Sequence, residues 1–307
     1  MRNAFFRALK KLFVEDVNVY FITGDLGFKL YDELRAHDPE RVINAGIREA
    51  AIAGMAAGLA SEGALPFIYS ITPFITLRCL EQIKLDICYH NFKVAVIGVG
   101  GGLAYGENGP THHGVDDLAL MRLLPRMSVF CPAGPVEVEK CVAAVKRLDG
   151  PVYIRLGRNG EPELTAPGVE PDIFRPQVMV DGADVTIIAT GPATGAAIGA
   201  AGILKEEGIS ARVVKVTRLK PLDEDALLKS IAPGGPVVTV EEHAGGAALA
   251  LPVADALLRA GAAPRFAKKC VPDEFPRECR SHAGLLEWSG LDAESIAAEC
   301  GRLVRGG

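Results

Sequence analysis

The sequence predicts an α/β protein made of two doubly wound three-layer α/β domains in tandem. Short β-rich runs alternate with helical patterns from end to end, which favours parallel sheets with helices on both faces. The length of 307 residues accommodates about two domains. The segment 161–176 contains four prolines and little periodicity, which indicates an extended linker. We therefore expect one domain at 1–160 and a second at 177–307.

The first half begins with an amphipathic helix. Within residues 1–16, the apolar Phe5, Leu9 and Phe13 recur at helical spacing among basic residues. The nearly continuous apolar run KVAVIGV is typical of a strand that is covered on both faces. The other elements expected here are, in order, a strand at Val17–Thr23, a helix at Arg48–Glu62, a strand at Pro66–Ser70, a helix at Leu77–Tyr89, strands at Lys93–Val99 and Ser128–Cys131, a helix at Val136–Arg147 and a strand at Val152–Arg155.

The second half repeats this alternation. The run DVTIIAT is rich in β-branched residues, and an Ala-rich helical pattern follows it. The expected elements are a strand at Asp184–Thr190, a helix at Ala193–Glu207, strands at Ala211–Val216 and Pro236–Val240, and a helix at Gly246–Arg259.

Composition excludes several classes of protein. Hydrophobic residues make up 49% and charged residues 23%, which suits a globular core and excludes a disordered or fibrous chain. A formal net charge of −5 argues against binding to nucleic acid or to an anionic membrane. No uncharged apolar run reaches the length of about 18–20 residues that a transmembrane helix needs. Residues 1–16 also lack the apolar centre and cleavage site of a secretory signal.

The cysteines indicate a reducing compartment. There are seven, an odd number, and no pair of them has metal-ligand spacing. We therefore expect reduced thiols and a cytoplasmic location. A mitochondrial presequence at the basic N-terminus is the alternative.

The first candidate site residue is Glu49, which stands just before the Ala-rich helix in GIRE (46–49). The helix dipole stabilises a carboxylate in the first turn, so an ordinary helix-start Glu is one interpretation. The other is a buried acid/base group, because the uncharged run AAIAGMAAGLA predicts a helix buried nearly all round. The residues alone leave both interpretations open.

The second candidate is the Gly-rich segment GENGPTHHG (106–114), which follows a predicted strand and its glycines. Ligands of open α/β sheets bind beyond the carboxyl ends of the strands. Two of the six histidines, His112 and His113, stand side by side there. A surface turn with incidental histidines is the alternative. We expect no metal site, because adjacent His side chains point apart and no third ligand is evident.

Taken together, the motifs resemble those of transketolases, and more narrowly the pyrimidine-binding and C-terminal domains of one. Each motif is weak alone, but their order over essentially the whole chain carries the resemblance. They are GDL (24–26), NAGIRE (44–49) with AGMAAGLASEG (53–63), PF (73–74) with LRCLEQI (77–83), GENGPTHHG (106–114), VYIRLGRNG (152–160), KPLD (220–223), and VEEH (240–243) followed by two glycines.

The other half of such an enzyme is missing from the sequence. Thiamine diphosphate enzymes hold the diphosphate through a divalent cation, with a Gly-Asp-Gly motif and an Asn downstream. Here GDLG (24–27) lacks the second Gly in place, and no Asn lies at the required spacing. The chain thus resembles the C-terminal subunit of a split transketolase. The resemblance implies a diphosphate-binding partner subunit that carries the Mg²⁺ ligands, a homodimer of this chain within a two-plus-two heterotetramer, and sugar substrates.

The resemblance also implies residues that bind the cofactor. Glu49 matches the catalytic Glu, which in that family hydrogen-bonds the N1′ atom of the aminopyrimidine ring of thiamine diphosphate. Phe74 matches an aromatic that packs on this ring, with a core Phe as the alternative. Ile71 makes the expected pocket partly aliphatic. Asp25 matches an Asp near the cofactor and the subunit interface.

A second group of residues is implied for the substrate. His112 matches the substrate-facing His of the Gly-Pro-Thr-His motif, for proton transfer or hydrogen bonding to donor hydroxyls. His113 stands where Gln is frequent, and Asn108 where many transketolases have an Asp that contacts a donor hydroxyl. Arg158 matches an Arg that binds substrate phosphate. Gly100 falls where many relatives have a phosphate-contacting His, which leaves phosphorylation of the substrate open.

The activity implied by the resemblance is transfer of a two-carbon ketol unit from a ketose, or ketose phosphate, to an aldose. The alternatives are the β subunit of a 2-oxo-acid dehydrogenase, a 1-deoxyxylulose-phosphate-synthase-like enzyme, and a non-catalytic subunit that keeps the fold. A nucleotide-binding module has little support, because the chain has no Walker Lys. We expect His243 to serve domain packing or the subunit interface rather than catalysis.

Overall fold

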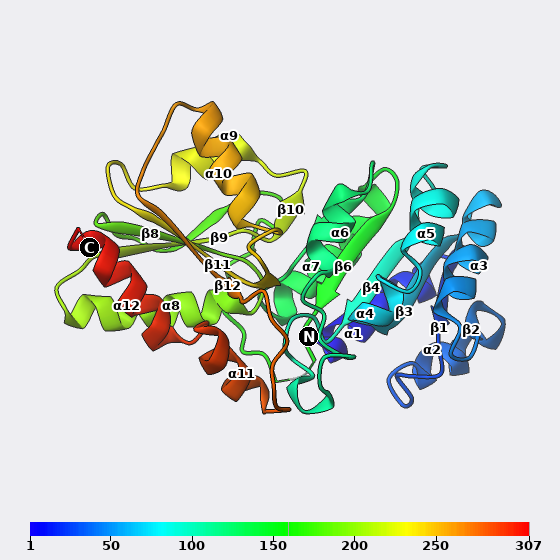
Figure 1. Cartoon of the computed structure of the whole chain (residues 1–307). Helices are drawn as coiled ribbons and strands as arrows, with labels where there is room; N and C mark the ends of the chain where they lie inside the picture. Colours follow the sequence, from blue (N-terminus) through cyan, green and yellow to red (C-terminus); the bar gives the residue numbers. More distant parts are fainter. Residues whose placement is uncertain (159, 307) are drawn as a thin grey trace.

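The computed structural model describes residues 1–158 and 160–306, which form two α/β units side by side (Figure 1). Each unit has a mostly parallel sheet with helices on both faces, as the sequence predicts. The N-terminus lies where the units meet, and its ammonium group is 2.8 Å from Glu161 Oε2. None of the helices in the described residues is long and apolar enough to cross a membrane.

The first sheet has the strand order β10-β5-β6-β4-β3-β1-β2, and only β10 runs antiparallel to its neighbour. Its strands are β1 (Val19–Thr23), β2 (Val42–Asn44), β3 (Leu65–Ile71), β4 (Ala95–Val99), β5 (Ser128–Phe130), β6 (Val152–Leu156) and β10 (Arg218–Lys220). The central β4 is buried along its whole length, which explains its unbroken apolar run. Because β1, β3, β4 and β6 are parallel, their carboxyl ends lie at one edge of the sheet.

Helices of this unit cover both faces of the sheet. On one face α1 packs against α7, and Phe5 of α1 stacks on Tyr69 of β3 with 5.7 Å between ring centroids. On the other face lie α3 and α6. The helical segments are α1 (Arg2–Glu15), α2 (Asp32–His37), η1 (Pro39–Arg41), α3 (Glu49–Ser61), α4 (Thr72–Ile75), α5 (Leu80–Gln82), η2 (Ile83–Cys88), η3 (Gly106–Asn108), α6 (Asp117–Leu123), α7 (Pro135–Ala144) and η4 (Val145–Arg147).

The single helix expected at Leu77–Tyr89 is instead a broken segment. The chain forms α4, then α5, then the π-helical turn η2. Side chains explain the break, because Thr76 Oγ1 donates to the carbonyl of Thr72 and the Cys79 thiol donates to that of Ile75. Such bonds to the preceding turn compete with regular helical hydrogen bonding.

The expectation that the helix at Arg48–Glu62 is buried nearly all round is wrong for the single chain. α3 turns Ile52 toward the core, but Ala51, Met55 and Gly58 are exposed on its outer side. No element of the described chain covers this outer side, so α3 presents an open apolar face.

The second sheet has the order β12-β11-β8-β9-β7, with only β7 antiparallel to its neighbour. Its strands are β7 (Gln177–Val180), β8 (Val185–Ala189), β9 (Ala211–Lys215), β11 (Val237–Ala244) and β12 (Phe266–Val271). Helices α8 and α12 lie on one face, and α9 and α10 on the other (Figure 1). Their bounds are α8 (Ala193–Glu206), α9 (Glu224–Ser230), α10 (Ala250–Arg259), α11 (His282–Ser289) and α12 (Ala293–Val304).

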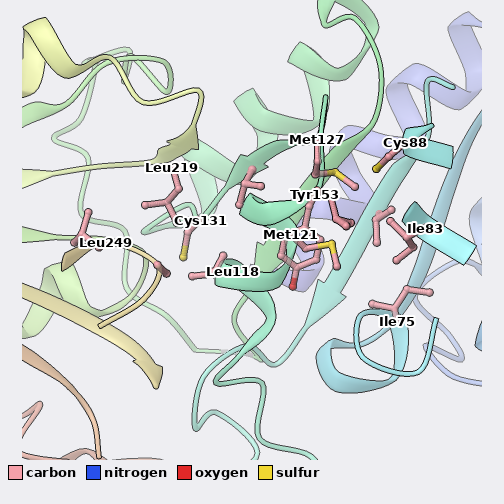
Figure 2. Packing of buried hydrophobic residues seen from close by; sticks show 14 of the residues in the cluster. Ile75, Ile83, Cys88, Leu118, Met121, Met127, Cys131, Tyr153, Leu219 and Leu249 are labelled. Carbon is pink, nitrogen blue, oxygen red and sulfur yellow. The ribbon is translucent and has the colours of Figure 1, made fainter. Parts of the chain in front are cut away.

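The two units are joined by a shared strand and a shared core. β10 comes from the C-terminal half but pairs with β5 of the first sheet, with Arg218 opposite Phe130. One buried cluster also runs through both units, and Figure 2 shows Leu219 and Leu249 on the same side of it as Cys131 and Leu118. The sequence did not predict β10, because three residues with two charges carry no strand pattern.

Candidate active site

The sequence-predicted site residues gather at the carboxyl edge of the first sheet. Gly24 and Asp25 follow β1, Ile71 ends β3, the segment 100–114 follows β4, and Arg158 follows β6. Loops at this edge of a parallel sheet form the usual ligand site of doubly wound folds. We call the segment 100–114 the substrate loop.

Glu49 lies inside this edge with both carboxylate oxygens engaged. It is the first residue of α3 and is 1% exposed. Its Oε1 accepts a hydrogen bond from Ser70 Oγ at 3.2 Å, and its Oε2 accepts one from Arg78 Nη1 at 2.6 Å. The Arg78 side chain is 48% exposed and so reaches from solvent to the buried group. This ion pair and the helix dipole compensate a charge that has been removed from water.

From Arg78 a continuous row of rings and cations crosses the edge of the sheet. The Arg78 guanidinium lies 4.7 Å from the ring centroid of Phe74, and Phe74 lies 5.2 Å from the ring of His112. The His112 ring is 6.0 Å from that of Tyr105, over which Arg158 sits at 4.9 Å. We call these five side chains the aromatic row. They place both cations over ring faces, which is a favourable electrostatic geometry.

The structure thus brings four predicted residues together, since the aromatic row contains Phe74, His112 and Arg158 and reaches Glu49 through Arg78. His112 is half-buried, and its Nδ1 lies 2.9 Å from Thr111 Oγ1. Its Nε2 has no hydrogen-bond partner among the described residues and is free to exchange a proton with a ligand.

The other predicted residues lie outside the row. His113 is buried, its Nε2 faces the carbonyl of Gly106 at 3.4 Å, and burial lowers the pKa of its imidazole. Asn108 is exposed in the turn η3. Ile71 is half-buried, next to the Ser70 that contacts Glu49. The structure therefore places His113 inside the substrate loop and Asn108 on its outer surface.

Asp25 is held by Asn44 in an unusual backbone conformation. Its φ of 58° is in the left-handed region, and its amide donates to Asn44 Oδ1 at 2.9 Å. Asn44 Nδ2 in turn donates to Asp25 Oδ1 at 3.2 Å. The neighbouring Gly24 packs so closely that an added Cβ would lie 3.6 Å from Glu49 Oε1. Asp25 therefore lies at the rim of the Glu49 site.

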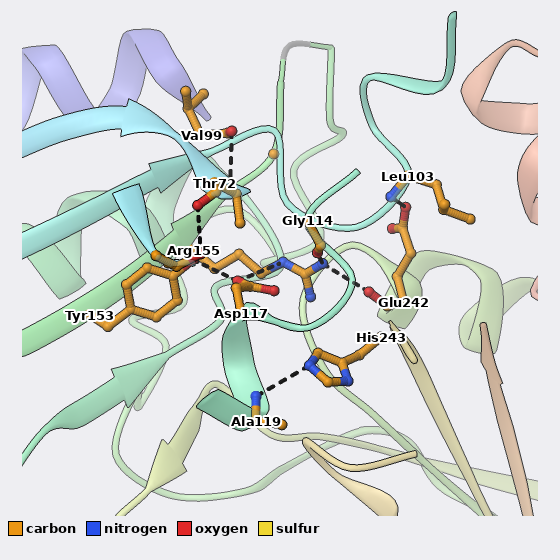
Figure 3. A network of polar contacts seen from close by, with 12 residues as sticks. Thr72, Val99, Leu103, Gly114, Asp117, Ala119, Tyr153, Arg155, Glu242 and His243 are labelled. Carbon is orange, nitrogen blue, oxygen red and sulfur yellow. Dashed lines mark hydrogen bonds and ion pairs between the residues drawn. The ribbon is translucent and has the colours of Figure 1, made fainter. Parts of the chain in front are cut away.

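A buried polar network forms the base of the substrate loop (Figure 3). Arg155 Nη2 donates to the carbonyls of Gly114 and Glu242 at 2.6 and 2.8 Å, and its Nε lies 3.5 Å from Asp117. Tyr153 donates its phenol hydrogen to the same Asp117 carboxylate at 2.6 Å. Arg155 therefore links the end of the loop to β11 of the second unit.

Sequence reasoning missed the parts played by Arg78, Ser70 and Arg155. Arg78 had a usable signal, because it is the charged residue of the otherwise uncharged run ITPFITLRCL (71–80), four residues after Phe74. Side chains at that spacing meet on a helical turn. Arg155 also had one, since a charge in a buried strand requires a partner. His243 accepts a hydrogen bond from the Ala119 amide, a contact between the units as expected.

The described residues contain no group of three His, Cys, Asp or Glu side chains that could hold a metal ion. The charged groups of the site are instead one buried carboxylate, two exposed arginines and a half-buried imidazole. This set suits acid/base chemistry and recognition of anionic or hydroxylated ligands.

Two tandem doubly wound units, with an acid/base site at the carboxyl edge of the first sheet, define a class of α/β enzyme subunits. The family within that class follows from sequence comparison. Residues 1–161 match the transketolase pyrimidine binding domain, and residues 176–296 match the transketolase C-terminal domain. The chain belongs to the transketolase family.

Individual relatives agree over nearly the whole chain. It is 34% identical to a putative transketolase C-terminal section of Methanocaldococcus jannaschii, covering 97% of this chain and 94% of the relative. It is 33% identical to one of the subunits of the apulose-4-phosphate transketolase of Phocaeicola vulgatus, covering 96% and 94%. Among solved structures, a split gene transketolase described as an inactive beta4 tetramer shares 36% identity, with a TM-score of 0.87 and coverage of 99% and 97%.

Proposed function

We propose that this chain is the C-terminal subunit of a split, thiamine-diphosphate-dependent transketolase. It transfers a two-carbon ketol unit from a ketose or ketose phosphate to an aldose or aldose phosphate, and it is active only with a separate diphosphate-binding subunit. The observation that carries the proposal is the buried Glu49 carboxylate at one end of the aromatic row, which ends at Arg158. The names of the relatives, one a C-terminal section and the other a transketolase subunit, support a divided enzyme.

The residues present fit the aminopyrimidine end of thiamine diphosphate. A buried carboxylate that already accepts two hydrogen bonds suits a ring nitrogen, and the half-buried Phe74 and Ile71 offer apolar contact. Asp25 lies at the rim of the same site. When bound, the cofactor supplies the nucleophilic carbon that carries the two-carbon unit. The described residues offer no metal cluster, so we assign the diphosphate and Mg²⁺ contacts to the partner subunit.

Each chain residue has a defined task in this proposal. Glu49 holds one proton at the cofactor ring nitrogen, and Arg78 stabilises the carboxylate. The open Nε2 of His112 hydrogen-bonds donor hydroxyls and moves their protons. Arg158 binds an anionic group at the far end of the row, which suits a sugar phosphate such as the one for which the Phocaeicola vulgatus relative is named. We assign Asn108 and His113 to the substrate side of the loop.

We assign the open apolar face of α3 to contact with another subunit. Ala51, Met55 and Gly58 present an uncharged surface beside Glu49, which is the kind of surface that marks an interface. The beta4 assembly of the split-gene relative supports self-association of such chains. In the proposed enzyme two copies of this chain and two diphosphate-binding subunits form a heterotetramer.

The test begins with a pull-down that uses the whole chain as bait. The expected result is a co-purifying subunit that carries a Gly-Asp-Gly motif with a downstream Asn. The assembly is then assayed for ketol transfer with thiamine diphosphate and Mg²⁺. Glu49→Gln in the assembly should lower kcat by at least about 10²-fold, because the amide cannot hold the ring proton in the same way. Glu62→Gln, at the exposed end of α3, is the matched control. Full activity of Glu49→Gln would overturn the proposal.

A further inference from the structure

The second unit reaches into the candidate site through its strand β11. The substrate loop is pinched at its neck, where Gly102 and Gly114 exchange backbone hydrogen bonds at 2.7 and 2.8 Å. Directly at this neck, Glu242 Oε1 accepts a hydrogen bond from the Leu103 amide at 2.6 Å. Gly102 has a φ of 65°, and a Cβ there would lie 2.5 Å from the Glu242 carboxyl carbon. The loop is therefore shaped to receive the Glu242 side chain.

The same carboxylate oxygen has a second partner. His282, the first residue of α11, places its Nε2 2.7 Å from Glu242 Oε1. Glu242 is 5% exposed, and Arg155 connects its backbone carbonyl to that of Gly114 (Figure 3). One carboxylate thus joins the start of the substrate loop, its end and the C-terminal part of the chain.

The segment before α11 packs on the turn of the loop. A Cβ at Gly109 would lie 3.2 Å from Cys279 Sγ, and one at Gly106 would collide with the carbonyl of Arg280. Figure 1 shows this orange segment descending beside the loop. The second unit therefore supports both the neck and the turn of the loop that carries His112.

We propose that Glu242 and His282 form a positioning pair through which the second unit sets the conformation of the substrate loop. The inference rests on the proposed function for its catalytic meaning, while the pair itself is defined by the contacts above. Neither side chain belongs to the aromatic row, so both act through the loop. Loss of the pair loosens the Leu103 contact and misplaces His112 relative to Phe74.

The charge of His282 makes the pair sensitive to pH. Burial opposes the charged imidazolium, but the charge of Glu242 and its hydrogen bond outweigh this and raise the pKa of His282. Burial likewise disfavours the Glu242 carboxylate, but attraction to His282 lowers its pKa. The other charged groups that act on His282 or line the cavity beside it are Glu161, Arg155, Arg2 and Arg158.

The sign of the effect follows from these directions. A raised His pKa gives a contribution that is complete below the ordinary value of 6.5 and is lost as pH rises through the raised pKa. A lowered Glu pKa gives one that is lost only in acid, below the ordinary value of 4.5. Both residues line a cavity of about 690 Å³ between the units, through which solvent reaches the pair. Alkaline pH therefore releases the loop.

The decisive measurement is hydrogen exchange at the Leu103 amide in the whole chain. Its protection factor should fall about tenfold between about pH 6 and pH 9, the worth of one charge-assisted hydrogen bond. In His282→Gln, which keeps a donor but no charge, protection should be low and independent of pH. His90→Gln, an exposed control, should behave as the wild type. Constant protection in the wild type, or the same fall in His282→Gln, overturns the proposal.

Activity of the assembled enzyme gives a second measurement. The wild-type KM for the ketose donor should rise over the same pH range while kcat changes less, and His282→Gln should show a raised, flat KM. A variant that only unfolds at lower temperature, with an unchanged KM profile, contradicts a positioning role. If the wild-type assembly transfers no ketol unit, the proposed function fails, and the exchange result still decides whether the pair holds the loop.

Discussion

The two sides of the candidate site differ in what closes them. On the loop side, Arg155, Glu242 and Asp117 are buried, and the second unit of the same chain covers them. On the Glu49 side, α3 exposes an apolar face and the counter-ion Arg78 is half in solvent. The chain therefore completes the loop side by itself, whereas the side assigned to the cofactor needs another surface to cover it. Substitutions on the two sides should have effects of different kinds.

The largest expected effect comes from breaking the closed side. Arg155→Met removes the counter-ion of the buried Asp117 and leaves the carbonyls of Gly114 and Glu242 without a donor. The free energy of unfolding should fall by about 3–5 kcal/mol, as for other broken buried ion pairs. Urea denaturation of the whole chain measures it. Arg35→Met, on an exposed turn of α2, should change it by less than about 0.5 kcal/mol. Equal stabilities of the two variants would remove the distinction between the sides.

A charge on the open side should spare folding and block association. Met55→Glu places a carboxylate in the centre of the apolar face of α3. Affinity for the co-purifying subunit, or for a second copy, should fall by about 10²-fold, while the unfolding midpoint stays nearly constant. Analytical ultracentrifugation measures the association. Val14→Glu makes the same change on α1, which covers the opposite face of the sheet. Unimpaired assembly of Met55→Glu would mean that this face is not an interface.

The smallest effect sharpens the comparison between the two ion pairs. Arg78→Met keeps a side chain over Phe74 but leaves the buried Glu49 carboxylate without its cation. Because Arg78 is half-exposed, the loss should be only about 1–2 kcal/mol in the free energy of unfolding. In the Glu49→Gln background the same change should cost less than about 0.5 kcal/mol. A four-protein denaturation cycle tests this. A loss as large as that of Arg155→Met would show that the Glu49 side is equally closed.

Much of this architecture could be predicted from local pattern. Long apolar runs such as Lys93–Val99 indicated the central strands, because both faces of those strands are covered. Short edge elements such as β10 were missed, since their place depends on a neighbour distant in sequence. The burial of α3 was predicted wrongly in the single chain, because an uncharged helix does not say which polypeptide covers it.

The site was predictable to the extent that its residues lie in recognisable motifs. Glu49, Phe74, His112 and Arg158 come from four separate segments, and the parallel sheet brings these segments to one edge. Arg78 was not assigned a role, because its contacts depend on the broken helix between Thr72 and Cys88. That break arises from side-chain hydrogen bonds that the helical pattern does not reveal.

The crossing of β10 into the first sheet limits how modular the chain is. A fragment that ended in the linker would expose the backbone edge of β5, which invites pairing with another chain. The Leu219 and Leu249 side of the shared core would be uncovered as well. Recombination between relatives at the linker therefore yields a soluble chimaera only when β5 and β10 come from compatible parents, so the two units evolve as one cooperative body.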